Sequence, residues 1–83
     1  MNYLLSYDIS NDKSRKRVSD YLIEKGFLRI QNSVFLGEIH VTKIDDILEN
    51  ICLFVDEDED SIFFFILGIL ILKKIYVPEY KVE

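Results

Sequence analysis

Asp8 is the one acidic side chain in the apolar segment 3–9, and its surroundings decide what chemistry the N-terminal part of this chain can perform. Burying an unpaired carboxylate is costly or shifts its pKa strongly. We therefore expect Asp8 to meet a metal ion, a cationic side chain or open solvent.

A metal ion is the alternative that gives Asp8 a catalytic role. One carboxylate is too little for a metal site, but a two-fold dimer presents a residue near its axis twice. Two Asp8 carboxylates suit Mg²⁺, which prefers oxygen ligands and keeps several waters. Such an ion polarises a phosphate and lowers the pKa of a bound water, as phosphodiester hydrolysis requires.

Three consecutive cations, Arg15, Lys16 and Arg17, lie near the start of a predicted helix. Cations at a helix N-terminus oppose the helix macrodipole, and an anionic partner would relieve that cost. Together with Arg29, these side chains are candidates to bind nucleic-acid phosphates. A solvated helix face explains the same charges without a ligand, so both interpretations stay open.

Other reactive side chains point to ordinary structural roles. The chain has no Gly-rich phosphate loop, nucleophile elbow or Cys/His metal motif. His40 is expected at the surface, at the end of a strand. Cys52 lies on the apolar stripe of a predicted helix and is expected to pack there. The acidic run 56–60 is expected to be a solvated loop, with loose cation binding or a basic partner as alternatives.

The composition predicts one domain, residues 1–83, that associates with itself. Of the 83 residues, 49% are hydrophobic, more than a small monomer can bury, so we expect a homodimer. A single cysteine and the lack of a signal-peptide pattern predict a cytoplasmic protein. The longest apolar run, 62–72, is too short for a membrane-spanning helix of about 20 residues, so no membrane partner is expected.

Charge is divided unevenly along the chain, whose net charge is −5. Residues 1–43 hold seven Lys and Arg against five Asp and Glu, whereas residues 44–83 hold three against ten. We therefore expect nucleic acid to meet the N-terminal half, and the C-terminal half to face protein or solvent.

The elements that must position these residues follow from hydrophobic periodicity and turn residues. Strands are expected over 3–9, 61–67 and 73–77, and a pair of short strands over 27–39 bends at Asn32 and Ser33. Gly37 indicates a bulge or a close approach. If the register of 27–39 runs unbroken, one face carries Arg29, Gln31, Ser33 and Phe35, whereas a tight hairpin at Asn32 and Ser33 splits that set. A helix is expected over 13–25, with capping side chains supplied by Ser10-Asn11-Asp12 and its end at Gly26. A second helix is expected over 42–54, capped by Thr42.

This order predicts an α+β, ferredoxin-like βαββαβ fold with an additional short C-terminal strand. The strand 61–67 is apolar on both faces, which favours a place in the middle of a covered sheet. Because both predicted helices lie on one side, the other side needs a second cover. We therefore expect a homodimer, with the C-terminal strand free to pair with the sheet edge of another chain.

A family resemblance is carried by residues in the first forty positions. They are Tyr7-Asp8-Ile9, Arg15-x-Arg17-Val18, Leu22, Gly26 and the segment 30–37, IQNSVFLG. In this combination the chain resembles the small CRISPR-associated "Cas-two" family, and the length and the element order agree with it.

The resemblance implies a homodimer whose sheets face each other, with the C-terminal strand packing on the partner's sheet. It also implies a place in the complex with the "Cas-one" integrase, which inserts new spacers into the CRISPR array. It implies that Asp8 is the catalytic, metal-binding aspartate of a Mg²⁺-dependent endonuclease acting on RNA or DNA. The positions that the family associates with activity or its surroundings are Tyr7, Arg15, Arg17, Arg29, Ser33 and Phe35.

Two other functions use the same residues. One is a non-catalytic scaffold that binds nucleic acid on the basic helix and supports the integrase. The other is a ribonuclease toxin of the virulence-associated-protein-D type, which is related in fold.

Overall fold

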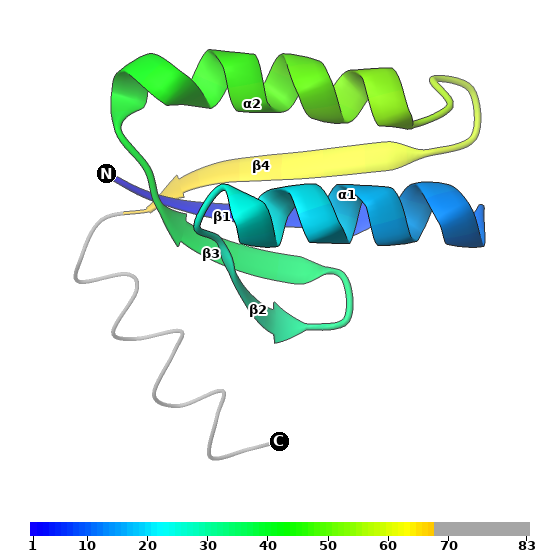
Figure 1. Cartoon of the computed structure of the whole chain (residues 1–83), viewed down its shortest axis with the longest axis horizontal. Helices are drawn as coiled ribbons and strands as arrows, with labels where there is room; N and C mark the ends of the chain where they lie inside the picture. Colours follow the sequence, from blue (N-terminus) through cyan, green and yellow to red (C-terminus); the bar gives the residue numbers. More distant parts are fainter. Residues whose placement is uncertain (68–83) are drawn as a thin grey trace.

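The computed structural model of the chain describes residues 1–67, and within them the predicted element order is confirmed (Figure 1). The elements are β1 (Asn2–Asp8), α1 (Asp12–Glu24), β2 (Leu28–Gln31), β3 (Val34–Glu38), α2 (Val41–Phe54) and β4 (Ser61–Leu67). The strands form one antiparallel sheet in the order β2-β3-β1-β4. This is the α+β, ferredoxin-like arrangement expected from the sequence.

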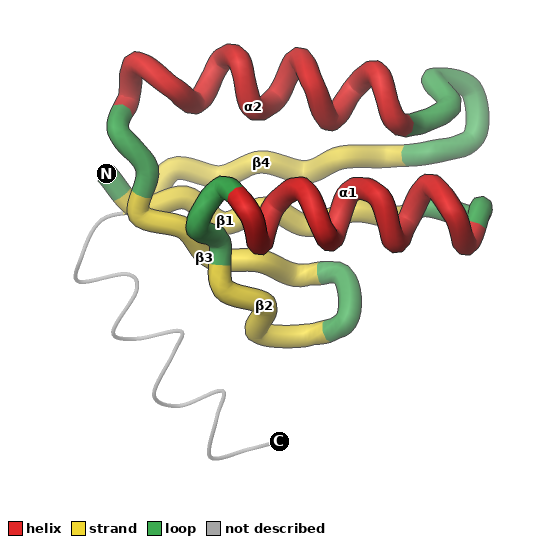
Figure 2. Tube along the Cα trace, viewed as in Figure 1, coloured by secondary structure: helices red, strands yellow, loops and turns green. Residues whose placement is uncertain are grey.

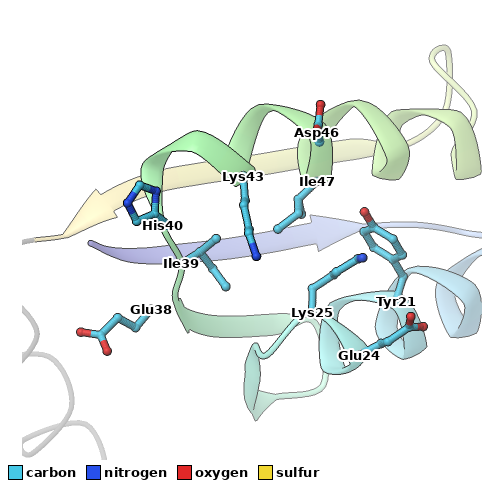
Figure 3. A pocket seen from close by; sticks show the side chains of 9 residues that line it. All are labelled: Tyr21, Glu24, Lys25, Glu38, Ile39, His40, Lys43, Asp46 and Ile47. Atoms are coloured by element: carbon cyan, nitrogen blue, oxygen red, sulfur yellow. The ribbon is translucent and has the colours of Figure 1, made fainter.

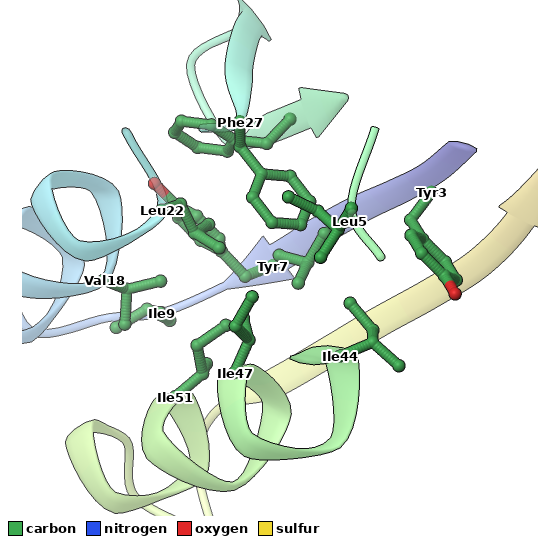
Figure 4. Packing of buried hydrophobic residues seen from close by; sticks show 12 residues of the cluster. Tyr3, Leu5, Tyr7, Ile9, Val18, Leu22, Phe27, Ile44, Ile47 and Ile51 are labelled. Carbon is green, nitrogen blue, oxygen red and sulfur yellow. The ribbon is translucent and has the colours of Figure 1, made fainter. Parts of the chain in front are cut away.

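Strand β1 alternates between a buried face and an open face, as its sequence predicts. Its buried side chains form one cluster with residues of both helices, so both helices pack on the same face of the sheet (Figure 4). The members contributed by β1 and its end, α1 and α2 are Tyr3, Leu5, Tyr7, Ile9, Val18, Leu22, Ile44, Ile47 and Ile51.

Helix α1 begins and ends at the predicted signals. The Asn11 side chain accepts a hydrogen bond from the backbone N–H of Ser14 at 3.0 Å, which caps the first turn. Gly26 has a φ of 100°, a left-handed conformation that stops the helix at little steric cost. The helix therefore starts four residues after Asp8, at Asp12, and its basic residues lie at the same end of the sheet as Asp8.

Helix α2 begins one residue earlier than expected, and Thr42 is not its cap. His40 takes that place: its Nδ1 accepts a hydrogen bond from the Thr42 backbone N–H at 3.2 Å. His40 is exposed, as predicted, but β3 already ends at Glu38, so His40 belongs to the helix start. An imidazole nitrogen satisfies the same unpaired N–H as a hydroxyl would, and the cap therefore needs no Ser, Thr, Asp or Asn.

The prediction that Cys52 packs in the core is wrong, since its side chain is exposed. The buried residues of α2 are Ile44, Ile47 and Ile51. These follow i, i+3, i+7 spacing, and Cys52 lies about 100° around the helix from Ile51. The stripe of side chains that α2 buries against the sheet is therefore narrower than the stripe of apolar residues in its sequence.

The segment 27–39 forms the tight hairpin that the sequence left as one of two alternatives (Figure 2). The register shifts between Arg29 and Gln31, and the chain turns at Asn32 and Ser33. Arg29 and Phe35 pair directly across the strands, so they share the face that the helices cover.

Gly37 makes a close approach, one of the two roles predicted for it. A Cβ atom at this position would lie 2.6 Å from Cδ2 of Phe27 and equally tight against other atoms of the same ring. Phe27 is buried, so the ring has little room to move.

We expect Gly37→Ala to lower the free energy of unfolding by about 1–3 kcal/mol through overpacking. Urea denaturation at fixed protein concentration measures this loss. The same substitution in a Phe27→Leu background should cost clearly less, because the ring that opposes the methyl group is gone. Equal losses in both backgrounds would show that the Phe27 ring is not the obstacle.

The prediction that the strand 61–67 lies in the middle of the sheet is wrong. Within residues 1–67, β4 lies at the edge of the sheet and pairs with β1 alone. Its second apolar face is therefore uncovered by the described part of the chain, and Phe63 and Phe65 are 51% and 50% exposed. The ferredoxin-like order fixes this position, because it places the fourth strand beside the first.

We call the side of the sheet opposite the helices the open face. Cross-strand pairing places its residues in rows. The rows are Glu38–Asn2–Leu67 at one end, then Leu28–Leu36–Leu4–Phe65 and Val34–Ser6–Phe63, and finally Asp8–Ser61 at the opposite rim. The middle of the open face is therefore mainly apolar, and a carboxylate lies at each end of it, Glu38 at one and Asp8 at the other.

The predicted strand 73–77 lies outside the described residues. In the part of the chain from Met1 to Leu67, no helix is both long enough and apolar enough to cross a membrane.

Candidate functional site

The chemistry-bearing residues gather at one end of the molecule. The C-terminal end of β1, the N-terminus of α1 and the turn between β2 and β3 all lie there (Figure 1). The sheet divides this end into two sides, because consecutive residues of β1 point to opposite faces. Tyr7 is buried on the helix side, and Asp8 is exposed on the open face.

Asp8 is the predicted catalytic residue, and solvent is the environment it meets. Within residues 1–67 its carboxylate makes no hydrogen bond or ion pair. It faces the same way as the uncovered side chains of Ser6 and Phe63 in the neighbouring row. An unpaired acid at the rim of an apolar surface is well placed to meet a group supplied from outside the chain.

A hollow of about 610 Å³ lies on the helix side of the same end, between α1 and the β2–β3 hairpin. We call it the basic hollow. Its lining residues are Tyr7, Asp12, Arg15, Lys16, Ser19, Asp20, Ile23, Arg29, Asn32 and Ser33. It brings together most of the residues predicted from the sequence, but Asp8 is not among them.

Arg29 is held in the basic hollow by a hydrogen bond and an aromatic ring. Its guanidinium donates a hydrogen bond to the Ser19 hydroxyl and lies 5.2 Å from the centre of the Phe35 ring. Phe35 is fully buried and supports the guanidinium from below. No carboxylate within residues 1–67 forms an ion pair with Arg29.

Arg15 and Lys16 line the same hollow, but each has an acidic partner. Arg15 donates a hydrogen bond to the Ile9 carbonyl at 3.0 Å and forms an ion pair with Asp12. Lys16 pairs with Asp20 at 2.7 Å. Both pairs join residues three or four apart on one helix and are exposed, so each contributes only a few tenths of a kcal/mol.

Arg17 does not join this group, although the sequence places it beside Lys16. Its guanidinium lies over the Phe54 ring of α2, 4.3 Å from the ring centre. Residues 15 and 17 are about 200° apart around a helix, so they cannot line one hollow. The helical spacing contains this information, since it places Arg17 beside the apolar stripe of the helix and Arg15 away from it.

Tyr7 joins the buried core to the basic hollow. Its ring stacks on Phe35, with 5.9 Å between ring centres, and its hydroxyl donates a hydrogen bond to the Asn32 carbonyl at 3.4 Å. Burial raises the pKa of the Tyr7 phenol above its usual value of 10.0, and the nearby guanidinium of Arg29 offsets only part of that effect.

This pKa shift predicts an alkaline loss of stability. The native state holds the Tyr7 proton more tightly than the unfolded chain, so the stabilisation is complete below the unfolded pKa of about 10 and is lost as the pH rises through the higher native value. Tyr7→Phe removes the titrating group, and unfolding free energies measured at a series of alkaline pH values should fall less steeply for the variant. Parallel pH profiles for both proteins would contradict the assignment.

Ser19 is the residue of this site that the sequence interpretation missed. Among residues 1–67 it is the one polar residue that is buried, with 5% of its surface exposed. Its hydroxyl accepts a hydrogen bond from the Arg29 guanidinium and so holds that group in place. Ser19 lies four residues after Arg15, so both occupy the same face of α1. That spacing was a usable indication, although a serine in a helix is rarely singled out.

A second hollow of about 560 Å³ opens at the other end of the helices (Figure 3). Its charged residues are Lys25 and Lys43 against Glu24, Glu38 and Asp46. The excess of carboxylates disfavours a polyanion. None of the predicted site residues lines this hollow, which leaves the basic hollow as the better anion site.

The fit of the expected Mg²⁺ depends on Asp8. Carboxylate oxygen is the ligand type that Mg²⁺ takes, and the Asp8 carboxylate is exposed and unengaged within residues 1–67. In that part of the chain no group of three His, Cys, Asp or Glu side chains is placed to hold an ion. One chain therefore supplies one ligand, and a shared site would need a second copy and water.

The chain is similar in sequence to proteins of known name. The CRISPR-associated endoribonuclease Cas2 1 of Archaeoglobus fulgidus is 38% identical over 63 residues, which is 76% of this chain and 67% of that protein. The endoribonuclease Cas2 2 of Pyrobaculum aerophilum is 39% identical over 51 residues, 61% of this chain and 56% of that protein. The matches thus cover between 56% and 67% of the length of these two relatives.

Solved structures agree with the fold. The crystal structure of Streptococcus pyogenes Cas2 at pH 6.5 has a TM-score of 0.78 at 29% identity and covers 89% of this chain and 93% of that one. The hypothetical protein TT1823 from Thermus thermophilus, at 24% identity and a TM-score of 0.75, supports the fold alone. A family model described as CRISPR associated protein Cas2 matches residues 1–69, and with the Asp8 rim and the basic hollow in place, the chain belongs to this family.

Proposed function

We propose that this chain is a Mg²⁺-dependent endonuclease that hydrolyses phosphodiester bonds of RNA as a homodimer, with one Asp8 from each subunit. The observation that carries the proposal is the unpaired, exposed Asp8 at the rim of an apolar open face. Both relatives described above are named endoribonucleases, which favours RNA over DNA as the substrate.

The open face supports the dimer. Exposed aromatic and aliphatic side chains rarely stay in water over a continuous area without a partner. Leu28, Phe63 and Phe65 are each at least half exposed there. A two-fold axis near the end of β1 would bury these rows against their copies and bring the two Asp8 carboxylates together.

The residues of the chain have separable tasks in this proposal. Bound Mg²⁺ supplies polarisation of the phosphodiester and a water of lowered pKa. The Asp8 carboxylates hold the ion and would repel each other without it. Arg29 and Arg15, held by Ser19 and the Ile9 carbonyl, orient the RNA backbone through guanidinium–phosphate hydrogen bonds.

The dimer half of the proposal is tested by Phe65→Lys on the open face. The wild type should have twice the 9.8 kDa mass of one chain in sedimentation equilibrium, and the variant should be monomeric and inactive toward RNA. Leu53→Lys, at a position 79% exposed on α2, is the matched control and should stay dimeric and active. A monomeric wild type, or an active monomeric variant, would overturn the paired arrangement.

A second candidate function is a non-catalytic scaffold that supports nucleic acid beside the Cas-one integrase during spacer acquisition. It is favoured by the separation of the basic hollow from Asp8, because binding on the helix side needs no carboxylate. Spacer integration that persists in an Asp8→Ala variant would favour this role over hydrolysis. The toxin alternative has no observation of its own in its favour.

A further inference from the structure

We infer that Ser61 is a positioning residue of the Asp8 site. Its hydroxyl donates a hydrogen bond to one oxygen of the Asp8 carboxylate and so turns the other oxygen toward the cation. The inference rests on the proposed function, which takes Asp8 as a ligand of Mg²⁺. It adds to the site a side chain from β4, an element far from Asp8 in the sequence.

Strand pairing places Ser61 directly opposite Asp8. The two residues form the last pair between β1 and β4, and both are exposed on the open face. Directly opposed residues have Cβ atoms about 4.5–5.5 Å apart, so a serine hydroxyl can reach a carboxylate there with one hydrogen bond. The pairing of β1 with β3 ends at Ser6. Within residues 1–67, Ser61 is therefore the only residue paired with Asp8 across the sheet.

Both groups are available for this contact. Within residues 1–67 the Ser61 hydroxyl and the Asp8 carboxylate each lack a hydrogen-bond partner. Carboxylates that bind metal ions are themselves hydrogen-bonded as a rule, and this outer contact orients them. A serine suits the task, because its hydroxyl donates a hydrogen bond and adds no positive charge that would repel a cation.

The residue before Ser61 holds the start of β4 in place. The Asp60 carboxylate accepts a hydrogen bond from the Ser10 backbone N–H at 3.2 Å and another from the Asp56 backbone N–H at 2.9 Å. The first of these ties the start of β4 to the segment that follows β1. The two strands are thus joined by a side-chain contact next to the Asp8–Ser61 pair, which opposes fraying at this end of the sheet.

The test measures the affinity of the protein for Mn²⁺, which takes the same oxygen ligands as Mg²⁺. Electron paramagnetic resonance detects the unbound Mn²⁺, so the measurement needs no cleavage. For Ser61→Ala we expect Mn²⁺ binding about tenfold weaker than in the wild type, the lower end of the usual cost of removing the partner of a metal ligand. Ser61→Thr keeps a hydroxyl at this position and should restore the wild-type affinity.

Ser6→Ala is the matched control. Ser6 lies on the same face of β1 as Asp8, but it is paired with Phe63. Its substitution removes a hydroxyl from the open face and should leave Mn²⁺ affinity unchanged. Both alanine variants should keep the thermal midpoint and the dimer mass of the wild type, which separates weaker binding from a loss of folding or assembly.

Several results would overturn the inference. These are an unchanged Mn²⁺ affinity in Ser61→Ala, an equal loss in Ser6→Ala, and a loss that Ser61→Thr does not restore. The proposed function fails on a different result, namely wild-type Mn²⁺ affinity in Asp8→Ala, which would remove the carboxylate that Ser61 is inferred to orient. Mn²⁺ binding that depends on Asp8 but not on Ser61 would refute the inference and leave the proposed metal ligand standing.

Discussion

Replacing Asp8 by alanine is expected to reduce Mg²⁺-dependent cleavage of RNA by at least about 100-fold. Mutation of a residue that only hydrogen-bonds to a metal ligand already costs about 10–100-fold in activity, and Asp8 is proposed as a ligand itself. Asp8 is exposed and makes no internal contact within residues 1–67, so the substitution should leave the fold and the dimer mass unchanged. Initial rates on a labelled single-stranded RNA, with and without EDTA, measure the effect.

The matched control for this experiment is Asp45→Asn on α2, another exposed carboxylate. It should cleave at the wild-type rate. Because traces of a contaminating ribonuclease would survive any substitution, all variants are purified in parallel through the same steps. Cleavage by Asp8→Ala at the wild-type rate would remove Asp8 from the mechanism.

Phe35→Ala is expected to lower the free energy of unfolding by about 3–5 kcal/mol, the usual cost of removing a buried aromatic ring. The side chain is fully buried, stacks on Tyr7 and supports the Arg29 guanidinium. The cavity would therefore weaken both the core and the floor of the basic hollow. Urea denaturation at one fixed protein concentration measures the loss, since dimerisation would make stability depend on concentration.

Leu53→Ala provides the comparison for this substitution. Leu53 is 79% exposed, so its truncation should change the unfolding free energy by no more than about 0.5 kcal/mol. A loss below about 1 kcal/mol for Phe35→Ala would mean that the core closes around the deleted ring, contrary to the tight packing inferred for it.

The element order was predictable because the local sequence and the tertiary fold agree here. Alternation along β1 gave both of its faces, and Asn11 and Gly26 marked the limits of α1. Asn32 and Ser33 marked the turn of the hairpin. In each case a short-range physical preference, such as side-chain capping or a left-handed glycine, decides the structure.

The errors arose where the tertiary arrangement overrides a local pattern. An apolar stripe on α2 includes Cys52, but the width of the contact with the sheet decides which residues are covered. A strand that is apolar on both sides suggests a central position, whereas chain connectivity places β4 at the edge. Such a strand is also consistent with an edge whose second face awaits a partner.

The site residues were predicted individually and their grouping was not. Sequence proximity suggested that Arg15, Lys16 and Arg17 act together, but helix geometry sends Arg17 toward Phe54. Arg29 comes from a different element and reaches the same hollow as Arg15, because the hairpin folds beside α1. Contacts of this kind depend on the packing of elements, which periodicity alone does not specify.

The central claim, that two Asp8 carboxylates from facing subunits act as one site, is tested most directly with mixed dimers. Wild-type and Asp8→Ala chains are unfolded together, refolded at varied ratios, and assayed for RNA cleavage at constant total protein. If both carboxylates are required, activity follows the square of the wild-type fraction, so an equal mixture retains about a quarter of the full rate. A linear dependence, with about half of the rate in the equal mixture, would show that each Asp8 acts alone and would contradict the paired site.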